Sequence, residues 1–252
     1  MSTAGPIDYF GEGVAARYDA DTAGVSTPEA VAPVVDFLAN LAGDGSALEF
    51  GIGTGRIGIP LHRRGVPVHG IDLSEAMLER LRIKAGTETL GVIRGDFATT
   101  TVDGLFNVVF VVFNTINNLT TQDAQVACFQ NAADHLAPGG HFVVEVEVPA
   151  VRLIPPGQNF HVFHISDERW SVDEYHFASQ NFTSHHLATR NGELHRNSIP
   201  FRYVFPEELD LMARLADMRR TARWAGWERE PFTDDSTKHV SVWQKDEGSH
   251  RS

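Results

Sequence analysis

Apolar residues follow two different periods along the first 150 residues, and the two periods alternate. Short apolar runs bounded by glycine or polar residues are typical of buried strands, and apolar residues that recur every three or four positions are typical of amphipathic helices. Strands are expected to end near residue 50 and to span 66–71, 90–93, 106–112 and 142–148, with helices beginning near residues 28, 58, 74 and 121. Because strands and helices alternate, we expect an α/β fold in which helices cover both faces of a parallel sheet.

The pattern changes between residues 151 and 205, where β-branched and aromatic residues alternate with polar ones. The strands expected here are 160–165, 170–178, 182–189 and 199–204. Asn191 and Gly192 lie between the last two, and both residue types tolerate the positive φ of a tight hairpin. We therefore expect an antiparallel β-lobe, inserted after the fifth strand, beside or over the ligand end of the sheet. A helix beginning at Pro206 and a strand over 239–244, at the sheet edge, complete the pattern.

These elements divide the chain into three parts. Residues 1–26 are polar and glycine-rich with a few aromatic residues, which is typical of a frayed end or of a lid that folds over a site. The helical character of residues 15–19 favours the lid. Residues 27–150 and 206–245 form the α/β domain. Residues 151–205 form the inserted lobe, which either encloses an acceptor pocket or makes a homodimer contact.

The composition is that of a globular protein, with 42% hydrophobic and 21% charged residues among 252. The net charge of −12 argues against a nucleic-acid or anionic-membrane surface, because both need basic patches. One basic cluster has the spacing of a solvated helix face: Arg214, Arg219, Arg220 and Arg223. The single cysteine excludes an intrachain disulfide, and no apolar run approaches a membrane span. With no export signal recognised, the chain is expected to be cytoplasmic.

A glycine-rich turn follows the first expected strand. Gly51, Gly53 and Gly55 let the backbone turn tightly and approach a ligand where a Cβ would clash, and the next helix offers free N–H groups at its start. The third glycine comes one residue too early for the Gly-x-Gly-x-x-Gly turn that binds a dinucleotide pyrophosphate. The turn opens on Glu49, which suits a ligand with a cationic head group and no phosphate.

Four motifs follow expected strands in order along the chain. They are Glu-x-Gly-x-Gly-Thr-Gly-Arg at 49–56, Gly-Ile-Asp-Leu-Ser-Glu-Ala-Met around Asp72, Gly-Asp-Phe at 95–97, and Leu-Ala-Pro-Gly-Gly before a strand. Together they resemble the motifs of class I S-adenosylmethionine-dependent methyltransferases, and the resemblance covers roughly residues 18–148. It implies a Rossmann-like, doubly wound and mostly parallel seven-stranded sheet. It also implies S-adenosylmethionine as the cofactor and methyl transfer as the reaction.

The acceptor implied by the resemblance is a small molecule. Nucleic-acid and protein methyltransferases of this fold usually carry basic or extended recognition surfaces, and this acidic chain has neither. The β-insertion is similar to that of small-molecule enzymes that methylate amino sugars and other natural products, which is an analogy of fold. Nitrogen, oxygen and carbon acceptors stay open. The alternatives are an S-adenosylmethionine-binding module without activity and a nicotinamide oxidoreductase, which the glycine spacing disfavours.

The resemblance also implies roles for single residues. Glu49 and the turn amides lie near the methionine end of the cofactor, Asp72 accepts from both ribose hydroxyls, and Asp96 accepts from the adenine amino group. Asn114 faces the methionine end, and Tyr18 closes over the sulfonium. The implied cofactor-binding residues are Tyr18, Glu49, Gly51, Gly53, Thr54, Gly55, Arg56, Asp72, Leu73, Met77, Asp96, Phe97 and Asn114. The alternatives are a helix-leading acid for Asp72 and a plain turn aspartate for Asp96.

Methyl transfer from a sulfonium is an in-line displacement, so alignment and desolvation supply much of the rate. A general base is needed only for a hydroxyl or a protonated amine, and we find no catalytic triad in the sequence. The candidate catalytic residues are Tyr18 in the lid and His176, a possible base in the most aromatic run of the lobe. No metal is expected, because His185 and His186 are adjacent on a strand and no cysteine or carboxylate completes a ligand set.

Overall fold

The computed structural model describes residues 7–84, 86–190 and 192–246. The strands are β1 (Ala47–Phe50), β2 (Val68–Asp72), β3 (Gly91–Arg94), β4 (Phe106–Val111), β5 (Leu136–Glu147), β6 (Phe160–Ile165), β7 (Arg169–His176), β8 (Asn181–Arg190), β9 (Glu193–Arg202), β10 (Met218–Trp224) and β11 (Lys238–Lys245). The α-helices are α1 (Glu12–Asp21), α2 (Pro28–Ala42), α3 (Gly58–Arg63), α4 (Glu75–Arg82), α5 (Gln122–His135) and α6 (Pro206–Leu215). Short 3₁₀ helices are η1 (Ala23–Val25), η2 (Thr115–Asn118) and η3 (Ala150–Leu153).

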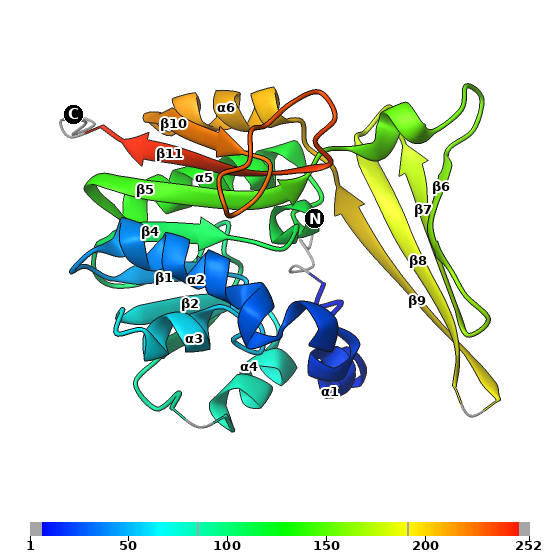
Figure 1. The fold of residues 1–252 in the computed structure, drawn as a ribbon, viewed down its shortest axis with the longest axis horizontal. Coiled ribbons are helices and arrows are strands. Elements are labelled where there is room, and N and C mark those ends of the chain that lie inside the picture. The colour runs from blue at the N-terminus through cyan, green and yellow to red at the C-terminus, as the bar shows by residue number, and fades with distance from the viewer. Residues whose placement is uncertain (1–6, 85, 191, 247–252) are drawn as a thin grey trace, which may run out of the picture.

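Seven strands form the larger sheet, in the order β10-β11-β5-β4-β1-β2-β3 (Figure 1). All neighbouring pairs from β5 to β3 are parallel, and β11 is antiparallel to both β5 and β10. The expected doubly wound, mostly parallel seven-stranded sheet is confirmed. The position of the last strand is corrected, because β11 lies inside the sheet. The edge strand next to β11 is β10, which the hydrophobic pattern does not predict.

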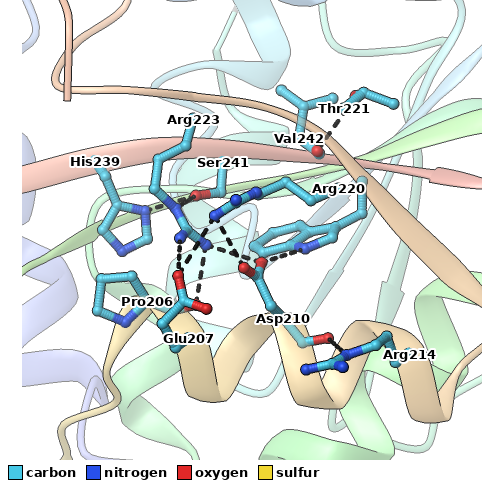
Figure 2. Close-up of polar contacts among 11 residues, drawn as sticks. Pro206, Glu207, Asp210, Arg214, Arg220, Thr221, Arg223, His239, Ser241 and Val242 are labelled. Carbon is cyan, nitrogen blue, oxygen red and sulfur yellow. Dashed lines mark hydrogen bonds and ion pairs between the residues drawn. The ribbon is translucent and has the colours of Figure 1, made fainter.

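The arginines of β10 do not form the solvated helix face expected from their spacing. Arg219, Arg220 and Arg223 lie on the strand, and Figure 2 shows two of them directed toward α6. The Arg223 Nη2 atom donates to Asp210 Oδ1 at 2.9 Å, and Arg220 Nη1 lies 2.9 Å from Asp210 Oδ2. Trp243 of β11 donates to the same carboxylate at 2.8 Å. One acid on α6 therefore fastens this helix to the edge of the sheet.

Helices cover both faces of the larger sheet, as expected. On one face α2 packs against β4, α3 against β2, and α4 against β2 and β3; Phe37 and Leu78 belong to the core cluster of this face. On the other face α5 and α6 pack through Phe129 and Met212. The central strand β4 is buried apart from Asn107, which explains its nearly unbroken apolar sequence.

Three helices begin at the capping residues that the sequence indicates. The side chains of Thr27, Ser74 and Thr121 accept hydrogen bonds from the backbone N–H three residues later, at 3.2, 3.4 and 3.1 Å. Each bond satisfies one of the free donors at a helix start. None of the helices in the described part of the chain is long and apolar enough to span a membrane.

The other four strands form an antiparallel sheet in the order β6-β7-β8-β9, which confirms the inserted β-lobe. Figure 1 shows the lobe beside the larger sheet, on the same side as α1. Strands β8 and β9 form a hairpin that ends at the pair Arg190 and Glu193. Gly192 has the expected positive φ, at 80°, and Asn191 lies outside the described residues. The division of the chain at residues 26, 150 and 205 stays a prediction.

The two faces of the lobe differ in burial. Because strand neighbours point to opposite faces, the cross-strand pairs define an inner face with mostly buried or half-buried residues: Ser171, Asp173, Tyr175, Ser184, His186 and Ile199. The outer face carries exposed apolar side chains: Phe160, Val162 and Trp170. The Tyr175 hydroxyl bonds to the backbone of Ala150, so the inner face is directed toward the segment that leaves β5.

Candidate functional site

The glycine motif forms a tight turn between β1 and α3. Gly51, Gly53 and Gly55 have φ values of 73°, 56° and 83°, which L-residues with a side chain rarely adopt. A Cβ on Gly51 would lie 2.4 Å from the Thr115 side chain, and a Cβ on Gly55 would lie 2.7 Å from Ile59. Glycine is therefore required by both the backbone angles and the packing at the carboxyl end of β1.

Asp72 is the last residue of β2, and its carboxylate lies against the glycine turn. Asp72 Oδ2 accepts from the Gly53 backbone N–H at 2.7 Å, and Oδ1 accepts from the Ser74 N–H at 2.9 Å. Burial raises the pKa of Asp72 to about 6, against the effect of these two bonds, and the charge of Asp8 adds to the increase. The structure thus brings together two motifs that the sequence places 19 positions apart.

Glu49 is the other acid beside the turn, and it is only 4% exposed. Its Oε2 atom is buried and has no hydrogen-bond partner among the described residues. Burial raises the pKa of Glu49 to about 8, although the charge of Arg56 and the Gly58 N–H oppose the increase and Asp72 adds to it. A buried carboxylate oxygen without a partner fits a ligand that carries a cationic group. The residues of this turn therefore fit the methionine end of S-adenosylmethionine.

The N-terminal helix α1 is fastened over the turn. The Asp19 carboxylate accepts from the Thr54 hydroxyl at 2.6 Å and lies 2.8 Å from Lys84 Nζ. Lys84 also donates to the Thr54 carbonyl at 2.7 Å. Nearby, the Ser74 hydroxyl donates to the Phe10 carbonyl at 2.9 Å. Residues 7–26 therefore lie over the site, and residues 1–6 of the expected lid lie outside the described residues.

Tyr18 is a residue of α1, and its hydroxyl experiences the charges of the acids at the site. Burial raises the pKa of the Tyr18 hydroxyl, Arg56 opposes the increase, and the charges of Asp72, Glu49 and Asp19 add to it. These four charged residues come from the lid, β1, the glycine turn and β2. The structure therefore places the Tyr18 hydroxyl in the electrostatic field of the implied cofactor residues.

Asn114 joins the carboxyl ends of β4 and β5. It has the left-handed conformation, with φ 61°. Its backbone N–H donates to the Glu145 carbonyl at 3.2 Å, and its Oδ1 accepts from the Glu147 N–H at 2.7 Å. The Glu145 carboxylate accepts from the N–H of Phe113 at 3.1 Å and from Trp227 Nε1 at 2.9 Å. Glu145 is thus paired within the protein, and Asn114 is held at the strand ends.

Arg56 and Thr54 end the glycine motif. The Arg56 guanidinium lies over the Phe113 ring, 4.4 Å from its centroid, which is within the range of a cation–π contact. Thr54 is buried; its hydroxyl donates to Asp19 of the lid, and its carbonyl accepts from Lys84, which follows α4. These two residues contact the surroundings of the turn and connect it to β4 and α1.

Asp96 and Phe97 follow β3 on the far side of Asp72. The Asp96 carboxylate accepts from the Ala98 N–H at 2.9 Å, a turn-forming bond that leaves carboxylate acceptor positions for a ligand. Phe97 is buried, and its ring stacks on Phe50 at 5.8 Å. Its side chain is part of the core, and only its backbone remains for the implied adenine contact.

Met77 and Leu73 flank Asp72. Met77 is buried in α4, and its Cε lies 3.6 Å from the place a Cβ on Gly53 would take. Leu73 is half-buried, and its carbonyl accepts from Arg94 Nε at 3.3 Å. The structure thus brings the implied cofactor residues from Tyr18 to Asn114 together at the carboxyl ends of the parallel strands of the larger sheet.

His176 does not join this group. It is exposed at the end of β7, and because it follows the inward Tyr175 its side chain belongs to the outer face of the lobe. Its role as a base stays a prediction. No group of three His, Cys, Asp or Glu side chains is placed to hold a metal ion within the part of the chain that the structure describes.

Sequence reasoning missed four residues of this region: Asp19, Lys84, Glu147 and Asp173. Asp19 was detectable, because it follows Tyr18 in the predicted lid. Asp173 alternates in phase with Tyr175 on a predicted strand, so its face was predictable but its surroundings were not. Lys84 carries no local signal, since its partners come from α1 and the glycine turn.

Comparison with known proteins agrees with this geometry. The family model described as "Methyltransferase domain" matches residues 47–140. A cypemycin N-terminal methyltransferase from Streptomyces sp is 27% identical over 209 residues, which are 79% of this chain and 83% of that protein. The SAM-bound structure of CalS10, an amino pentose methyltransferase from Micromonospora echinaspora, has a TM-score of 0.68 at 22% identity, covering 90% of this chain and 96% of that one.

The structure of the CcbJ methyltransferase from Streptomyces caelestis is similar over almost the whole chain. It is 32% identical, with a TM-score of 0.85, and the match covers 95% of this chain and 100% of that one. The similarity therefore includes the lid and the lobe as well as the larger sheet. By this relationship and by the site at the glycine turn, the chain belongs to the family of S-adenosylmethionine-dependent methyltransferases.

Proposed function

We propose that this enzyme methylates a nitrogen atom of a small natural-product acceptor, bound between α1 and the inner face of the lobe. One observation carries the proposal: α1 is fastened by Asp19 across the turn that holds Glu49, beside the lobe that follows β5. A small molecule fits a site closed by a lid, whereas the acidic chain lacks a basic surface for nucleic acid. The nitrogen acceptor is supported by the curated relative, which is an N-terminal methyltransferase.

Residues at the strand ends would hold the cofactor. Glu49 offers an unpartnered carboxylate oxygen to its ammonium group, and Asp72 offers acceptors to its ribose hydroxyls. Asp96 and the Phe97 backbone would bind the adenine, next to Met77. When bound, S-adenosylmethionine supplies a methyl group on a positively charged sulfur. A neutral nucleophile would attack the methyl carbon in line with the carbon–sulfur bond, and the sulfur would leave as S-adenosylhomocysteine. The chain itself has to align the nucleophile and exclude water.

The lid supplies the exclusion of water. Asp19, Thr54 and Lys84 hold α1 against the turn, and α1 places Tyr18 over the acids of the site. A partly buried phenol in this position restricts solvent access to the nucleophile and leaves a hydroxyl for orientation. We propose that this alignment by Tyr18 carries most of the rate and that an amine acceptor reacts in its neutral form.

The test is an assay with S-adenosylmethionine and a panel of amine-bearing natural products. Formation of S-adenosylhomocysteine and a product heavier by one methylene is expected, with NMR placing the new methyl on nitrogen. A methyl on oxygen or carbon would contradict the nitrogen assignment. Tight binding of S-adenosylhomocysteine with no turnover on any acceptor would favour the inactive binding module, and binding of NAD instead would favour the oxidoreductase.

A further inference from the structure

The carboxylate of Asp173 has an unused hydrogen-bonding position on the inner face of the lobe. Its Oδ1 atom is buried and has no hydrogen-bond partner among the described residues. The Ser184 hydroxyl, opposite Asp173 on β8, bonds to the same carboxylate. A buried acceptor without a donor destabilises the folded protein unless a ligand supplies the donor. The free position therefore indicates a ligand group that donates hydrogen bonds.

Asp173 lies across from the strand ends that border the cofactor site. Asn114, which lies between β4 and η2, accepts through Oδ1 from the backbone N–H of Glu147 at 2.7 Å. The charge of Glu147 in turn acts on Asp173 and on Tyr175 of the inner face. Asp173 and Glu147 therefore approach the same region from two sides, one from the lobe and one from β5.

The charges around Asp173 favour a cationic ligand. Burial raises the pKa of Asp173 to about 6. The Ser184 hydrogen bond and the charges of His161 and His185 oppose this increase, and the charge of Glu147 adds to it. A cation bound beside this carboxyl group would oppose the effect of burial and favour the ionised form. A buried carboxylate that also experiences a second negative charge is stabilised when a cation lies beside it.

A chain of polar contacts holds this part of the inner face in place. The Ser184 hydroxyl lies 3.2 Å from His186 Nε2, and His186 Nδ1 lies 3.1 Å from the Ser171 hydroxyl. Ser171 is fully buried. Because its neighbours are bound to one another, the Asp173 carboxylate is held in position before a ligand arrives, which reduces the entropy cost of binding.

We infer that Asp173 binds the amino group of the methyl acceptor as it arrives in its cationic form and thereby selects amines over alcohols of the same shape. The bound ammonium loses one proton to solvent before the neutral nitrogen attacks the methyl carbon. The inference rests on the proposed function, because it places the acceptor between the lid and the lobe. It adds to that function a residue that recognises the acceptor, and it names amines as the class of acceptor that this residue binds. A merely structural role for Asp173 would not discriminate between an amine and an alcohol.

The experiment uses the full chain with trans-4-aminocyclohexanol and trans-1,4-cyclohexanediol as matched probes. Formation of S-adenosylhomocysteine is measured at saturating S-adenosylmethionine for wild type, Asp173→Asn and the control Glu174→Gln. Glu174 is the next residue of β7 and lies on the opposite face. We expect wild type to methylate the amine and not the diol. Asp173→Asn should raise KM for the amine roughly 30-fold or more, with the affinity for S-adenosylhomocysteine unchanged.

A thermal unfolding scan separates recognition from folding. Asp173→Asn should melt at the same temperature as wild type or higher at pH 8, because it removes a buried negative charge, one oxygen of which has no hydrogen-bond partner among the described residues. An unchanged KM for the amine in Asp173→Asn overturns the inference. The inference is also overturned if wild type methylates both the amine and the diol, or neither of them. Failure of the proposed function itself is distinguishable, since wild type would then not bind S-adenosylhomocysteine or would place the methyl on another atom.

Discussion

The Asp19 carboxylate on α1 accepts a hydrogen bond from the Thr54 hydroxyl at 2.6 Å and so joins the lid to the glycine turn. Lys84 bonds to both residues, at 2.8 and 2.7 Å. The three side chains form a latch that closes one side of the cofactor site. Its strength is limited because the side chains of Asp19 and Lys84 are partly exposed, at 55% and 32%.

Breaking this latch should weaken cofactor binding. Asp19→Ala removes both the hydrogen bond and the ion pair, and we expect the affinity for S-adenosylhomocysteine to fall roughly 3- to 10-fold, since a partly exposed charged bond contributes about 1 kcal/mol. Titration calorimetry measures the effect. Glu12→Gln, exposed at the other end of α1, is the matched control. Equal affinities of Asp19→Ala and wild type would show that α1 does not close over the bound cofactor.

Glu49 should make the free protein less stable as the pH rises. Its pKa in the folded state is raised to about 8 by burial, so the folded state holds this proton more tightly than the unfolded chain. The associated stability is fully present below the usual pKa of glutamate and is lost as the pH rises through 8. Glu49→Gln should remove this pH dependence, which amounts to up to about 5 kcal/mol of unfolding free energy at pH 9. Parallel falls in melting temperature for both proteins between pH 5 and 9 would exclude Glu49 as the cause.

Binding of S-adenosylhomocysteine should release a proton from Glu49. The ammonium group of the ligand favours the ionised carboxylate and lowers the raised pKa. Near pH 6.5 we expect about one proton released per bound molecule. Calorimetry in phosphate and in Tris, which differ in ionisation enthalpy, measures this number. In Glu49→Gln the released fraction should be close to zero, and an unchanged release in that variant would assign the proton to another group.

Asp72→Ala should reduce cofactor affinity and, to a smaller extent, stability. Loss of a charged acceptor for two ribose hydroxyls is expected to cost about 1.5–3 kcal/mol of binding. The N–H groups of Gly53 and Ser74 also lose their acceptor, so a loss of about 1–2 kcal/mol in unfolding free energy is expected. Calorimetry and urea unfolding measure the two effects. If only stability changes, Asp72 supports the turn and leads the helix without binding the ribose.

Substitution of His176 and Tyr18 separates a base from an aligning lid residue. If His176 is the base, His176→Phe should lower kcat by about two to four orders of magnitude with cofactor affinity unchanged. From its exposed position on the outer face we expect kcat near wild type. Tyr18→Ala should lower kcat strongly, whereas Tyr18→Phe, which keeps the ring, should retain more activity. Steady-state assays on all three variants, each checked for folding by circular dichroism, decide between the two roles.

The sequence by itself determined the elements and the cofactor turn. Glycine spacing fixed the turn at 51–55, because backbone angles of positive φ are set locally and exclude other residues. The Ser74 cap and the apolar run of β4 were equally readable, since capping and burial leave their pattern within a few residues. Local chemistry therefore predicted the larger sheet, apart from β10 and the inner position of β11, and the insertion of the lobe after β5.

The tertiary structure decided which distant groups meet. Arg220 and Arg223 of the edge strand β10 pair with Asp210 of α6, and no local period reveals a partner on another element. Lys84 reaches the lid in the same way. Asp173 acquires its unpartnered oxygen only from the packing of β7 against β8 and the segment after β5. Periodicity along a chain shows which side of an element is buried, but the charges that face it depend on how the elements pack together.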